Sequence, residues 1–489
     1  MRPLQAIVLI IATTLTLAGC ATRPVNLPVT QVSSTTGYRY LARDSNDREN
    51  LVILAFSGGG TRAAAFSYGV LELLRRTEIV GPKGNTLRLI DSVDVITGVS
   101  GGSFTALAYG LYGERLFAEY EPRFLKRDVQ GELISRSLNP KYWSALSSDG
   151  WGRSELAAQF YDEILFNGAT FADLERGKGP FIIASATDIS TGARFVFGQG
   201  VFDVLCSDLS GVRLSRAAAA SSAVPVVLSP VTMNNYGGSC NYQVPEWLTM
   251  FVDGSDPPRP AARAIRQFRE LQAYNDGAHR PYIHLVDGGV SDNVGMRGVL
   301  DAMETMEALH QLGLPTPLDH VRRIIVFVVN SLSSPPTNWD ELARSPGTID
   351  ILLKATGVPI DHYSFEAIEL LNDTAARWRL LHNLRNSAGF RDSRDPRISK
   401  ELRSPDAEIY AIDVSFPALR NKTELEYLNQ QPTSFVLPPE AVDRLRAAAG
   451  TIILDAPEFQ RLLRDVGAKI VPPAPADTPR VNADAATQH

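Results

Sequence analysis

The chain has 489 residues, of which 44% are hydrophobic and 21% are charged, as in an ordinary globular protein. This length fits one large domain with an extension, or two domains. The formal net charge of −6 offers no basic surface for a polyanion, which argues against nucleic acid as a partner.

Residues 1–19 have the features of a signal peptide. After Arg2, an uncharged apolar segment is shorter than the roughly 20 residues that would cross a bilayer. The segment ends in LAGC, which resembles the lipobox of bacterial lipoproteins and implies lipidation of Cys20 and attachment to a membrane. Ala21 after the cysteine implies the outer membrane, by similarity to enterobacterial lipoproteins. An ordinary cleavage site beside a chance cysteine is the alternative.

The rest of the chain divides into four segments. Residues 20–48 are polar and lack periodicity, which predicts a flexible tether behind the anchor. Residues 49–340 alternate short apolar runs with amphipathic segments, the pattern of an α/β layer fold. Residues 341–470 predict a mostly helical extension with one strand at 407–414, and the composition of 471–489 predicts a disordered tail.

Six strands are expected in the α/β region. They are Leu51–Phe56, Val93–Ile96, Phe181–Thr187, Ala193–Phe197, Tyr282–Val286 and Arg323–Val329. Residues 139–166 contain Trp143 and Trp151, for which helical core packing is expected and a lid or a membrane-facing surface is the alternative.

Cysteine and histidine usage predicts no metal site and no cofactor. The seven histidines are scattered, and neither a Cys-x-x-Cys nor a His-Glu-x-x-His pattern occurs. Apart from Cys20, the chain has only Cys206 and Cys240. Both a disulfide and two buried thiols are compatible with that pair in an oxidising compartment.

A glycine-rich turn follows the first expected strand. The sequence SGGGTR places Gly58, Gly59 and Gly60 between a strand and a helix, where N–H groups without side chains suit a tetrahedral oxyanion. A phosphate cradle or a plain turn would use the same glycines, but the lysine of a nucleotide-binding loop is absent. Arg62 either steadies this turn through nearby carbonyls, approaches an anionic head group or lies in solvent.

A second glycine motif surrounds Ser100. The sequence GVSGG, residues 98–102, is a G-x-S-x-G pattern between the expected strand VDVI and a helical segment. Gly98 and Gly102 permit a sharp turn that presents the serine hydroxyl at a helix N-terminus, where the dipole favours developing negative charge. An ordinary Gly-Ser turn has the same pattern, but the flanking strand and helix favour a catalytic serine.

A carboxylate lies at the end of the apolar run YIHLV, where Asp287 is followed by a Gly-Gly turn. With an ordinary pKa near 4, such a group deprotonates a serine only if geometry and partial desolvation help. Asp-Gly is also a common turn signal.

Together these motifs resemble the patatin-like phospholipase family over roughly residues 49–300, in the family's order. A fourth block, AAAASSAVPVVLSP, resembles the family's Ala-Ser-x-Ala-x-Pro segment at Ser221, Ser222, Ala223 and Pro225. The chain departs from the family pattern at two places, Ser57 and Gly101. Neither departure removes a chemical role.

The resemblance implies a three-layer α/β/α sandwich with a mainly parallel sheet. It implies a Ser-Asp dyad, in which Ser100 attacks an ester carbonyl, Asp287 takes the proton and Gly58, Gly59 and Gly60 hold the oxyanion. Phospholipids or lysophospholipids are the implied substrates, while simple esters, acylglycerols and thioesters stay open.

Two other functions stay open. One is an esterase with a Ser-Asp-His triad, because His310 and His320 follow Asp287 in the chain order of α/β-hydrolases. His310 lies in a helical pattern and His320 in a Pro-containing connection, which argues against it, and His284 is expected as a core or supporting residue. The other is a lipid-binding lipoprotein without catalysis, which the intact motifs argue against.

Overall fold

The computed structural model describes residues 22–40, 49–81, 84–148, 151–225, 227–246, 249, 261–311, 313–334, 339–341, 343–387, 389 and 406–472. The expected signal peptide, Cys20 and the tail from residue 473 lie outside the described residues, as does the 41–48 part of the expected tether.

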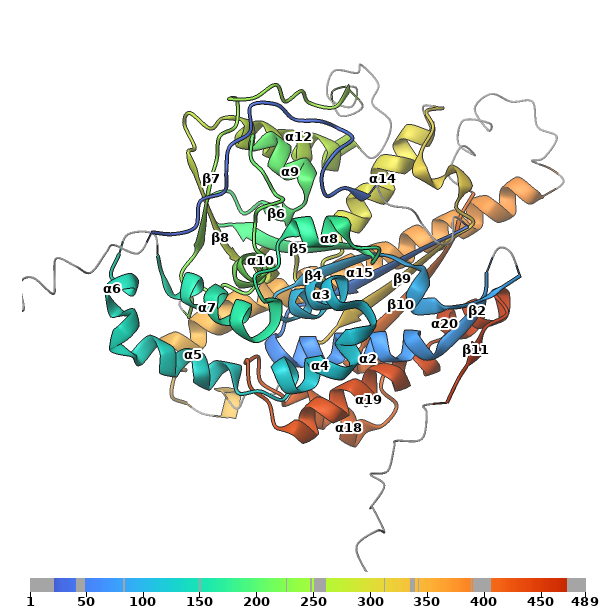
Figure 1. Ribbon diagram of the computed structural model, residues 1–489. Helices are drawn as coiled ribbons and strands as arrows, with labels where there is room; N and C mark the ends of the chain where they lie inside the picture. The colour runs from blue at the N-terminus through green and yellow to red at the C-terminus, as the bar shows by residue number, and fades with distance from the viewer. Residues whose placement is uncertain are drawn as a thin grey trace, which may run out of the picture.

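A mixed, mostly parallel sheet forms the centre of the molecule (Figure 1). Its order is β10-β9-β1-β4-β5-β8-β7, with β6 paired to β5, and β8 runs antiparallel to β5. The strands are β1 (Asn50–Phe56), β4 (Val93–Val99), β5 (Phe181–Asp188), β6 (Arg194–Phe197), β7 (Val231–Asn234), β8 (Tyr282–Asp287), β9 (Arg323–Asn330) and β10 (Glu408–Ser415). All seven expected strands are confirmed, whereas β7 and the three short strands of a separate small sheet were not expected.

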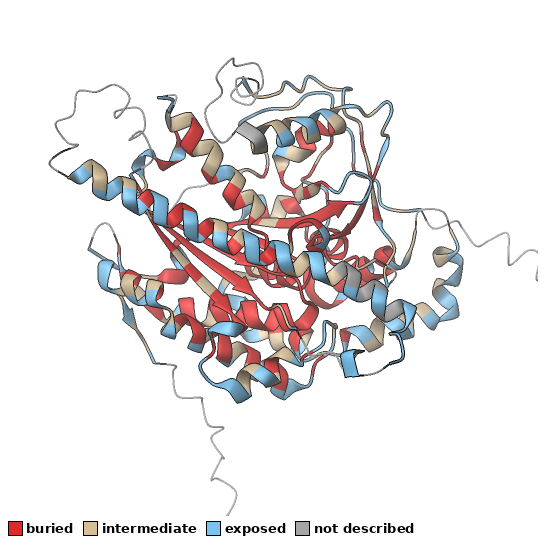
Figure 2. Ribbon diagram, turned by 180° about the vertical axis from the view of Figure 1, so that it is seen from behind, coloured by how far each residue is buried: buried red, intermediate tan, exposed pale blue. Residues whose placement is uncertain are grey.

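Helices cover both faces of the sheet, as expected for a three-layer sandwich. One core joins alternate side chains of the central strands to α2 (Gly60–Arg76), α3 (Gly101–Tyr112), α10 (Leu214–Ser221) and α19 (Pro439–Asp455). The opposite core joins the remaining side chains to α14 (Arg297–Gln311) and α15 (Thr348–Asn386). Figure 2 shows α15 lying across that face with its outer side exposed. Burial on both faces explains why the strands read as continuous apolar runs.

Shorter elements complete the fold. The helices are α4 (Leu116–Tyr120), α5 (Val129–Leu138), α6 (Trp143–Leu146), α7 (Arg153–Tyr161), α8 (Phe171–Arg176), α9 (Gln199–Val204), α12 (Ala261–Asn275), α13 (Gly289–Asp292), α18 (Lys422–Asn429) and α20 (Pro457–Asp465). A small separate sheet has the order β11-β2-β3, formed by Lys469–Ile470, Thr77–Val80 and Thr86–Arg88.

The region expected as a C-terminal extension, 341–470, shares the core of residues 49–340. Its strand β10 pairs in parallel with β9 along eight residues. Its helix α19 packs so closely on α2 that a methyl group at Gly69 would overlap the carbonyl oxygen of Arg446. This region therefore supplies one edge of the sheet and part of one covering layer.

The prediction of a flexible tether is wrong for residues 22–40, which pack along the body. The buried Asn26 side chain donates to Ser207 Oγ at 2.7 Å and accepts from the Asn234 N–H at 2.8 Å. The buried Tyr38 hydroxyl accepts from the Ile182 N–H at 2.7 Å. Composition cannot predict these contacts, because each polar group bonds to a partner that is at least 144 residues away in the chain.

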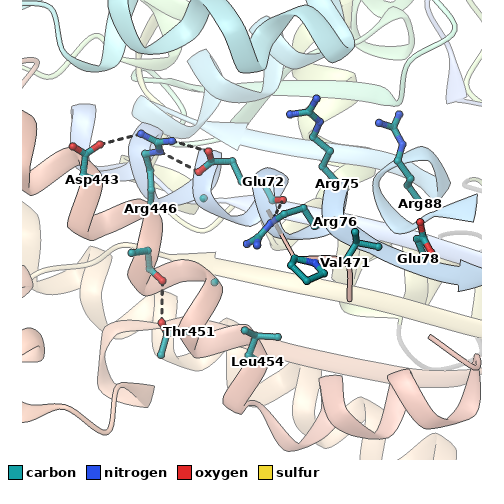
Figure 3. Close-up of a pocket in the computed structure, with 14 residues that line it drawn as sticks. Glu72, Arg75, Arg76, Glu78, Arg88, Asp443, Arg446, Thr451, Leu454 and Val471 are labelled. Carbon is teal, nitrogen blue, oxygen red and sulfur yellow. Dashed lines mark hydrogen bonds and ion pairs between the residues drawn. The ribbon is translucent and has the colours of Figure 1, made fainter. Parts of the chain in front are cut away.

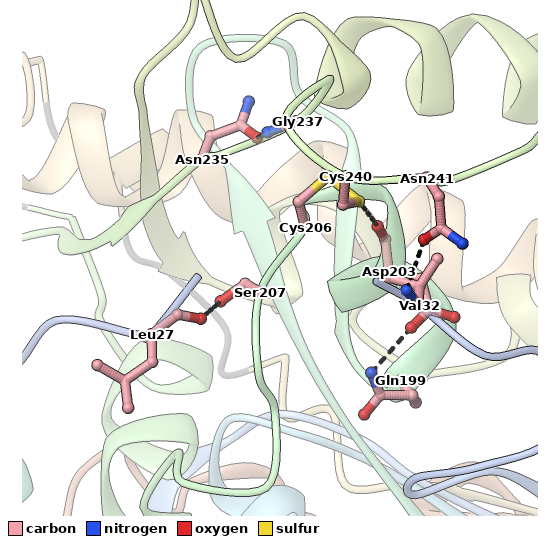
Figure 4. Close-up of a disulfide and its surroundings, with 10 residues drawn as sticks. All are labelled: Leu27, Val32, Gln199, Asp203, Cys206, Ser207, Asn235, Gly237, Cys240 and Asn241. Carbon is pink, nitrogen blue, oxygen red and sulfur yellow. Dashed lines mark hydrogen bonds between the residues drawn. A yellow bond between two sulfur atoms is a disulfide. The ribbon is translucent and has the colours of Figure 1, made fainter. Parts of the chain in front are cut away.

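Cys206 and Cys240 form a disulfide, with their Cα atoms 5.6 Å apart (Figure 4). The N-terminal segment runs beside this bond, where the Val29 N–H donates to the Cys206 carbonyl at 2.8 Å. The disulfide therefore braces the part of the body on which residues 22–40 pack.

The tryptophan-containing segment 139–166 splits into two environments. Helix α7 buries Leu156, Phe160 and Tyr161, so the expectation of core packing is confirmed there. Helix α6 buries none of its residues, and Trp143 is exposed, so that expectation is wrong for α6. In the described part of the chain, no helix is long and apolar enough to cross a membrane.

Candidate active site

Ser100 lies at the turn between β4 and α3 in a strained backbone conformation. Its φ of 48° and ψ of −121° fall outside the regions that non-glycine residues favour. Such a conformation costs on the order of 1 to 3 kcal/mol and persists only where the surroundings enforce it. The serine is buried, and its side chain lies at the N-terminus of α3.

Glycines enforce this turn by letting backbones approach each other. A Cβ at Gly98 would lie 2.7 Å from Ser103 Cα, and one at Gly102 would lie 2.6 Å from the Ser57 carbonyl oxygen. A methyl group at Gly101 would overlap the Gly60 carbonyl oxygen. The start of α3 therefore rests directly on the β1–α2 turn, and the departure from the family pattern at Gly101 has a steric reason.

Sheet register brings the carboxylate to the serine. Val99 pairs with Ser185 on β5, and the next β5 residue, Ala186, pairs with Asp287 on β8. The Ser100 hydroxyl donates to Asp287 Oδ2 at 2.8 Å. The second carboxylate oxygen, Oδ1, accepts from the Gly289 N–H at 2.8 Å, which fixes the orientation of the carboxylate.

Burial raises the pKa of Asp287 to about 6, against the opposing effects of the hydrogen bonds from the Gly289 N–H and the Ser100 hydroxyl. A carboxylate with this pKa is ionised at neutral pH yet is a stronger base than an exposed aspartate. Both properties suit a group that accepts a proton from serine.

The glycine-rich turn differs in one donor from the expectation. The Gly58 N–H donates to the Asn293 carbonyl at 2.9 Å, so the prediction that it binds the oxyanion is wrong. Gly59 and Gly60 have φ values of 140° and 59°, which favour glycine, and their N–H groups bond to no acceptor within the described residues. These two N–H groups are the donors that the turn offers to a ligand.

Arg62 steadies the turn and does not reach solvent. Its buried guanidinium donates to the Ser331 carbonyl at 2.7 Å, to the Gln431 carbonyl at 2.6 Å and to Thr433 Oγ1 at 3.1 Å. Burial lowers the pKa of Arg62 to about 10, so the side chain stays charged at neutral pH. Of the three roles considered for Arg62, the structure supports the one that binds carbonyls.

Residues 431–434, here called the C-terminal strap, hold the glycine turn from outside. Besides accepting from Arg62, the strap accepts the Thr61 N–H at the Ser434 carbonyl, 2.8 Å away. A methyl group at Gly60 would overlap that same carbonyl. No sequence motif predicts the strap, because it binds Arg62 and Thr61 mainly through backbone carbonyls, which every residue has. The Gln431 carbonyl lies 369 residues from Arg62 in the chain.

The fourth motif supports both Ser100 and Asp287. Ser221 Oγ accepts from the Ser100 N–H at 2.8 Å and donates to the Ser185 carbonyl at 2.6 Å. The Asp287 N–H donates to the Ala223 carbonyl at 2.9 Å. The block that the sequence marked only by resemblance therefore positions the serine and the aspartate together.

Asn293 was missed by the sequence reasoning. Its carbonyl accepts the Gly58 N–H, and its side-chain oxygen would meet a Cβ placed at Gly289 at 2.9 Å. Asn293 therefore lies between the glycine turn and the aspartate turn. The one feature of the sequence that pointed to Asn293 is its position six residues after Asp287, in DGGVSDN.

The histidines do not complete a triad. His310 Nδ1 lies 3.4 Å from Asp319, and among the described residues no histidine bonds to Asp287. His284 is exposed and bonds to Thr232 Oγ1 at 3.0 Å, so the expectation of a core or supporting role is wrong. In the described part, no cluster of three His, Cys, Asp or Glu residues is placed to hold a metal.

A charged groove of about 870 Å³ lies elsewhere, between α2, α19 and the small sheet (Figure 3). Arg446 crosses it and pairs with Glu72 at 2.7 Å and with Asp443 at 3.0 Å. Glu72 is 12 residues along α2 from Gly60, or about 18 Å from the glycine turn. The groove's charges bind α19 to α2 and are unsuited to a neutral ester.

A strained serine that donates to a buried aspartate, beside free backbone donors, is an arrangement suited to carboxylic ester hydrolysis. Residues 54–300 match the family model described as patatin-like phospholipase. The chain belongs to this family of carboxylic ester hydrolases.

Two solved structures show partial similarity. Human GIVD cytosolic phospholipase A2 is 14% identical, with a TM-score of 0.40, over 86% of this chain and 62% of its own. VipD from Legionella pneumophila is 13% identical, with a TM-score of 0.30, over 93% of this chain and 74% of its own. The chain thus spans less than two thirds of the human structure. No curated protein matches the chain.

Substitution of Gly101 tests the contact between the two glycine turns. Gly101→Ala should lower kcat for a soluble ester by about 100-fold, the loss typical of a displaced oxyanion donor, because its methyl group displaces Gly60. Gly450→Ala is the matched control, since a methyl group there meets no atom within 4 Å. Full activity of a folded Gly101→Ala variant would contradict the contact.

The pH dependence of hydrolysis follows from the pKa of Asp287. Only the ionised carboxylate accepts a proton, and its pKa is raised to about 6. The value of kcat/KM for a soluble ester should therefore rise with pH, reach half its maximum near pH 6 and level off above about pH 7. A half-maximum near pH 4, the ordinary value for an aspartate, would contradict the effect of burial.

Proposed function

We propose that the protein is a serine lipid acyl hydrolase that cleaves fatty acyl esters of phospholipids or lysophospholipids with a Ser100–Asp287 dyad. The observation that carries the proposal is the 2.8 Å hydrogen bond from the Ser100 hydroxyl to a buried carboxylate whose pKa is about 6. Nucleophile and base are in direct contact, so the proton transfer needs no intermediary.

Acylation forms one bond and breaks one. Ser100 Oγ attacks the ester carbonyl carbon while its proton moves to Asp287 Oδ2. The carbonyl oxygen becomes an oxyanion that accepts from the Gly59 and Gly60 N–H groups. Each such donor contributes roughly 3 to 4 kcal/mol to the stability of the transition state. When the tetrahedral intermediate collapses, the C–O bond to the alcohol breaks and Asp287 returns the proton to the departing oxygen.

Deacylation repeats these steps with water. Asp287 takes a proton from water as its oxygen attacks the acyl-serine carbonyl, and the same N–H groups bind the second oxyanion. Collapse releases the fatty acid, and the proton returns to Ser100 Oγ. The Gly289 N–H keeps Asp287 oriented through both halves of the reaction.

Membership of the patatin-like phospholipase family supports a lipid ester as the substrate. The supports of the glycine turn, Arg62 and the C-terminal strap, are buried or bonded to each other, so neither competes for a head group. We therefore assign no head-group preference to Arg62.

We also propose a lipid anchor at Cys20 that holds the protein at the bacterial outer membrane. The LAGC sequence and Ala21 support this location. The described chain begins at residue 22, and Arg23 already donates to the Thr232 carbonyl at 3.2 Å. An anchor at Cys20 would therefore keep the folded body close to the bilayer.

Variants of the dyad test the activity. Ser100→Ala and Asp287→Asn should each release fatty acid from mixed phospholipid micelles about 100-fold or more slowly than the wild type, because each removes a reacting group. Melting curves and circular dichroism check that the variants are folded. His284→Ala and His310→Ala are controls that should keep most of the activity. Loss of activity in either control would favour a histidine-dependent mechanism.

Replacement of Cys20 tests the anchor. In bacteria labelled with a radioactive fatty acid, the wild-type protein should carry label and sediment with the outer membrane. Cys20→Ser should carry none, because serine offers no thiol to the lipid. Label retained by Cys20→Ser would contradict the anchor, and the Ser100 activity would remain a separate question.

A further inference from the structure

Three exposed apolar side chains lie close together in the chain on α5 and α6. Ile134 and Leu138 are 52% and 68% exposed, and Trp143, which begins α6, is 55% exposed. Ile134 and Leu138 are four residues apart and so share one face of α5. The other side of α5 packs on the body through Val129 and Leu133. The fold therefore leaves one apolar stripe of α5 uncovered.

The first turn of α5 is linked to α3 through Phe435. Gln130 in the first turn of α5 donates its N–H to the Phe435 carbonyl at 3.3 Å and accepts the Phe435 N–H at 3.1 Å. The Phe435 ring packs edge-on against Phe104, which lies on α3 four residues after Ser100. Phe435 also directly follows the strap residue Ser434. Helix α5 is therefore linked through Phe435 to α3, the helix that begins directly after Ser100.

A loop from the fourth motif adds to the same region. Val227, two residues after Pro225, is 58% exposed. Ser229, two residues further on, accepts the Ser154 N–H at 3.1 Å. This bond connects the loop to the start of α7, the next helix in the chain after α6. Exposed apolar side chains therefore lie both on α5–α6 and on the loop that follows Ser221 and Ala223.

The charge of this region differs from that of the whole chain. Residues 133–148 contain Arg136 and Lys141 but no Asp or Glu, although the chain carries a net charge of −6. Arg136 pairs with Glu163 at 2.6 Å, so Lys141 is the cation that this segment offers to a partner. The Lys141 ammonium lies 5.5 Å from the Tyr142 ring centre, next to Trp143. Tryptophan and tyrosine beside cations and aliphatic side chains are typical of surfaces that lie in the interface of a bilayer.

The chain also enters the body on this side. Arg23 bonds to Thr232 and Asn234 on β7, the strand that follows the Val227 loop. Figure 1 shows the first described residues on the same side of the molecule as α5 and α6. A lipid at Cys20 would thus hold this side, and not the opposite one, toward the membrane.

We propose that Ile134, Leu138, Lys141, Trp143 and Val227 form a docking surface that inserts into the interface of an anionic lipid bilayer. The proposal rests on the proposed function, because a hydrolase of membrane lipids meets its substrate at a bilayer surface. Burial of these four apolar side chains supplies affinity, and the Lys141 ammonium favours anionic head groups.

The test compares hydrolysis of lipid vesicles with hydrolysis of a soluble short-chain ester. With vesicles of phosphatidylcholine and phosphatidylglycerol, Leu138→Asp in the full chain should lower the rate about tenfold or more, because it places a charge in the inserted stripe. The soluble ester should be cleaved within about twofold of the wild-type rate, because the catalytic residues are untouched. Leu380→Asp is the matched control, because Leu380 is 59% exposed near the C-terminal end of α15. That end of α15 points away from α6 (Figure 1).

Tryptophan fluorescence separates docking from catalysis. Vesicles with brominated acyl chains should quench the wild type, and Trp143→Phe should remove that quenching. Wild-type rates on vesicles for Leu138→Asp, an equal loss in Leu380→Asp, or quenching that persists in Trp143→Phe would each overturn the docking surface. If the wild type cleaves neither substrate yet Trp143 is quenched, the proposed function fails and the docking surface stands.

Discussion

The site depends on the register of β5, which pairs in parallel with β4 on one side and antiparallel with β8 on the other. Because β4 and β8 run in opposite directions, their C-terminal ends pair with the neighbouring β5 residues Ser185 and Ala186. Ser100 directly follows β4, and Asp287 is the last residue of β8. A slip of one residue in either pairing would turn side chains to the other face of the sheet. The hydrogen bond between the hydroxyl and the carboxylate is therefore set by the backbone of the core.

Around that hydrogen bond, segments of backbone pack directly against one another at glycines. The backbone of Gly101 packs against that of Gly60, and the backbone of Gly60 packs against that of Ser434 in the C-terminal strap. Arg62, two residues after Gly60, bonds to the Ser331 carbonyl after β9 and to the strap through the Gln431 carbonyl and the Thr433 hydroxyl. A buried charged donor left without one of these acceptors would cost on the order of 1 to 3 kcal/mol. The C-terminal third of the chain thus helps to hold the glycine turn in place, although the family match ends at residue 300.

Features encoded by neighbouring residues were predictable, and features that join distant segments were not. The strands, the turn at Ser100 and the turn at Asp287 each follow from a few consecutive residues whose periodicity or glycine content limits the backbone. The loss of the Gly58 donor to Asn293 depends on a carbonyl 235 residues away, and a carbonyl is present in every residue. The packing of Asn26 and Tyr38 and the exposure of Trp143 likewise depend on tertiary neighbours that composition does not specify.

The central claim is that Ser100 is the nucleophile. It is tested most directly by exposing the folded protein to an alkyl fluorophosphonate and mapping the adduct by peptide mass spectrometry. Attack by Ser100 Oγ on phosphorus would expel fluoride and transfer the hydroxyl proton to Asp287, which leaves one phosphonyl group on the protein. The account predicts that the group lies on the peptide that contains Ser100, in one copy per chain. An adduct on another residue, or no adduct on folded protein, would contradict it.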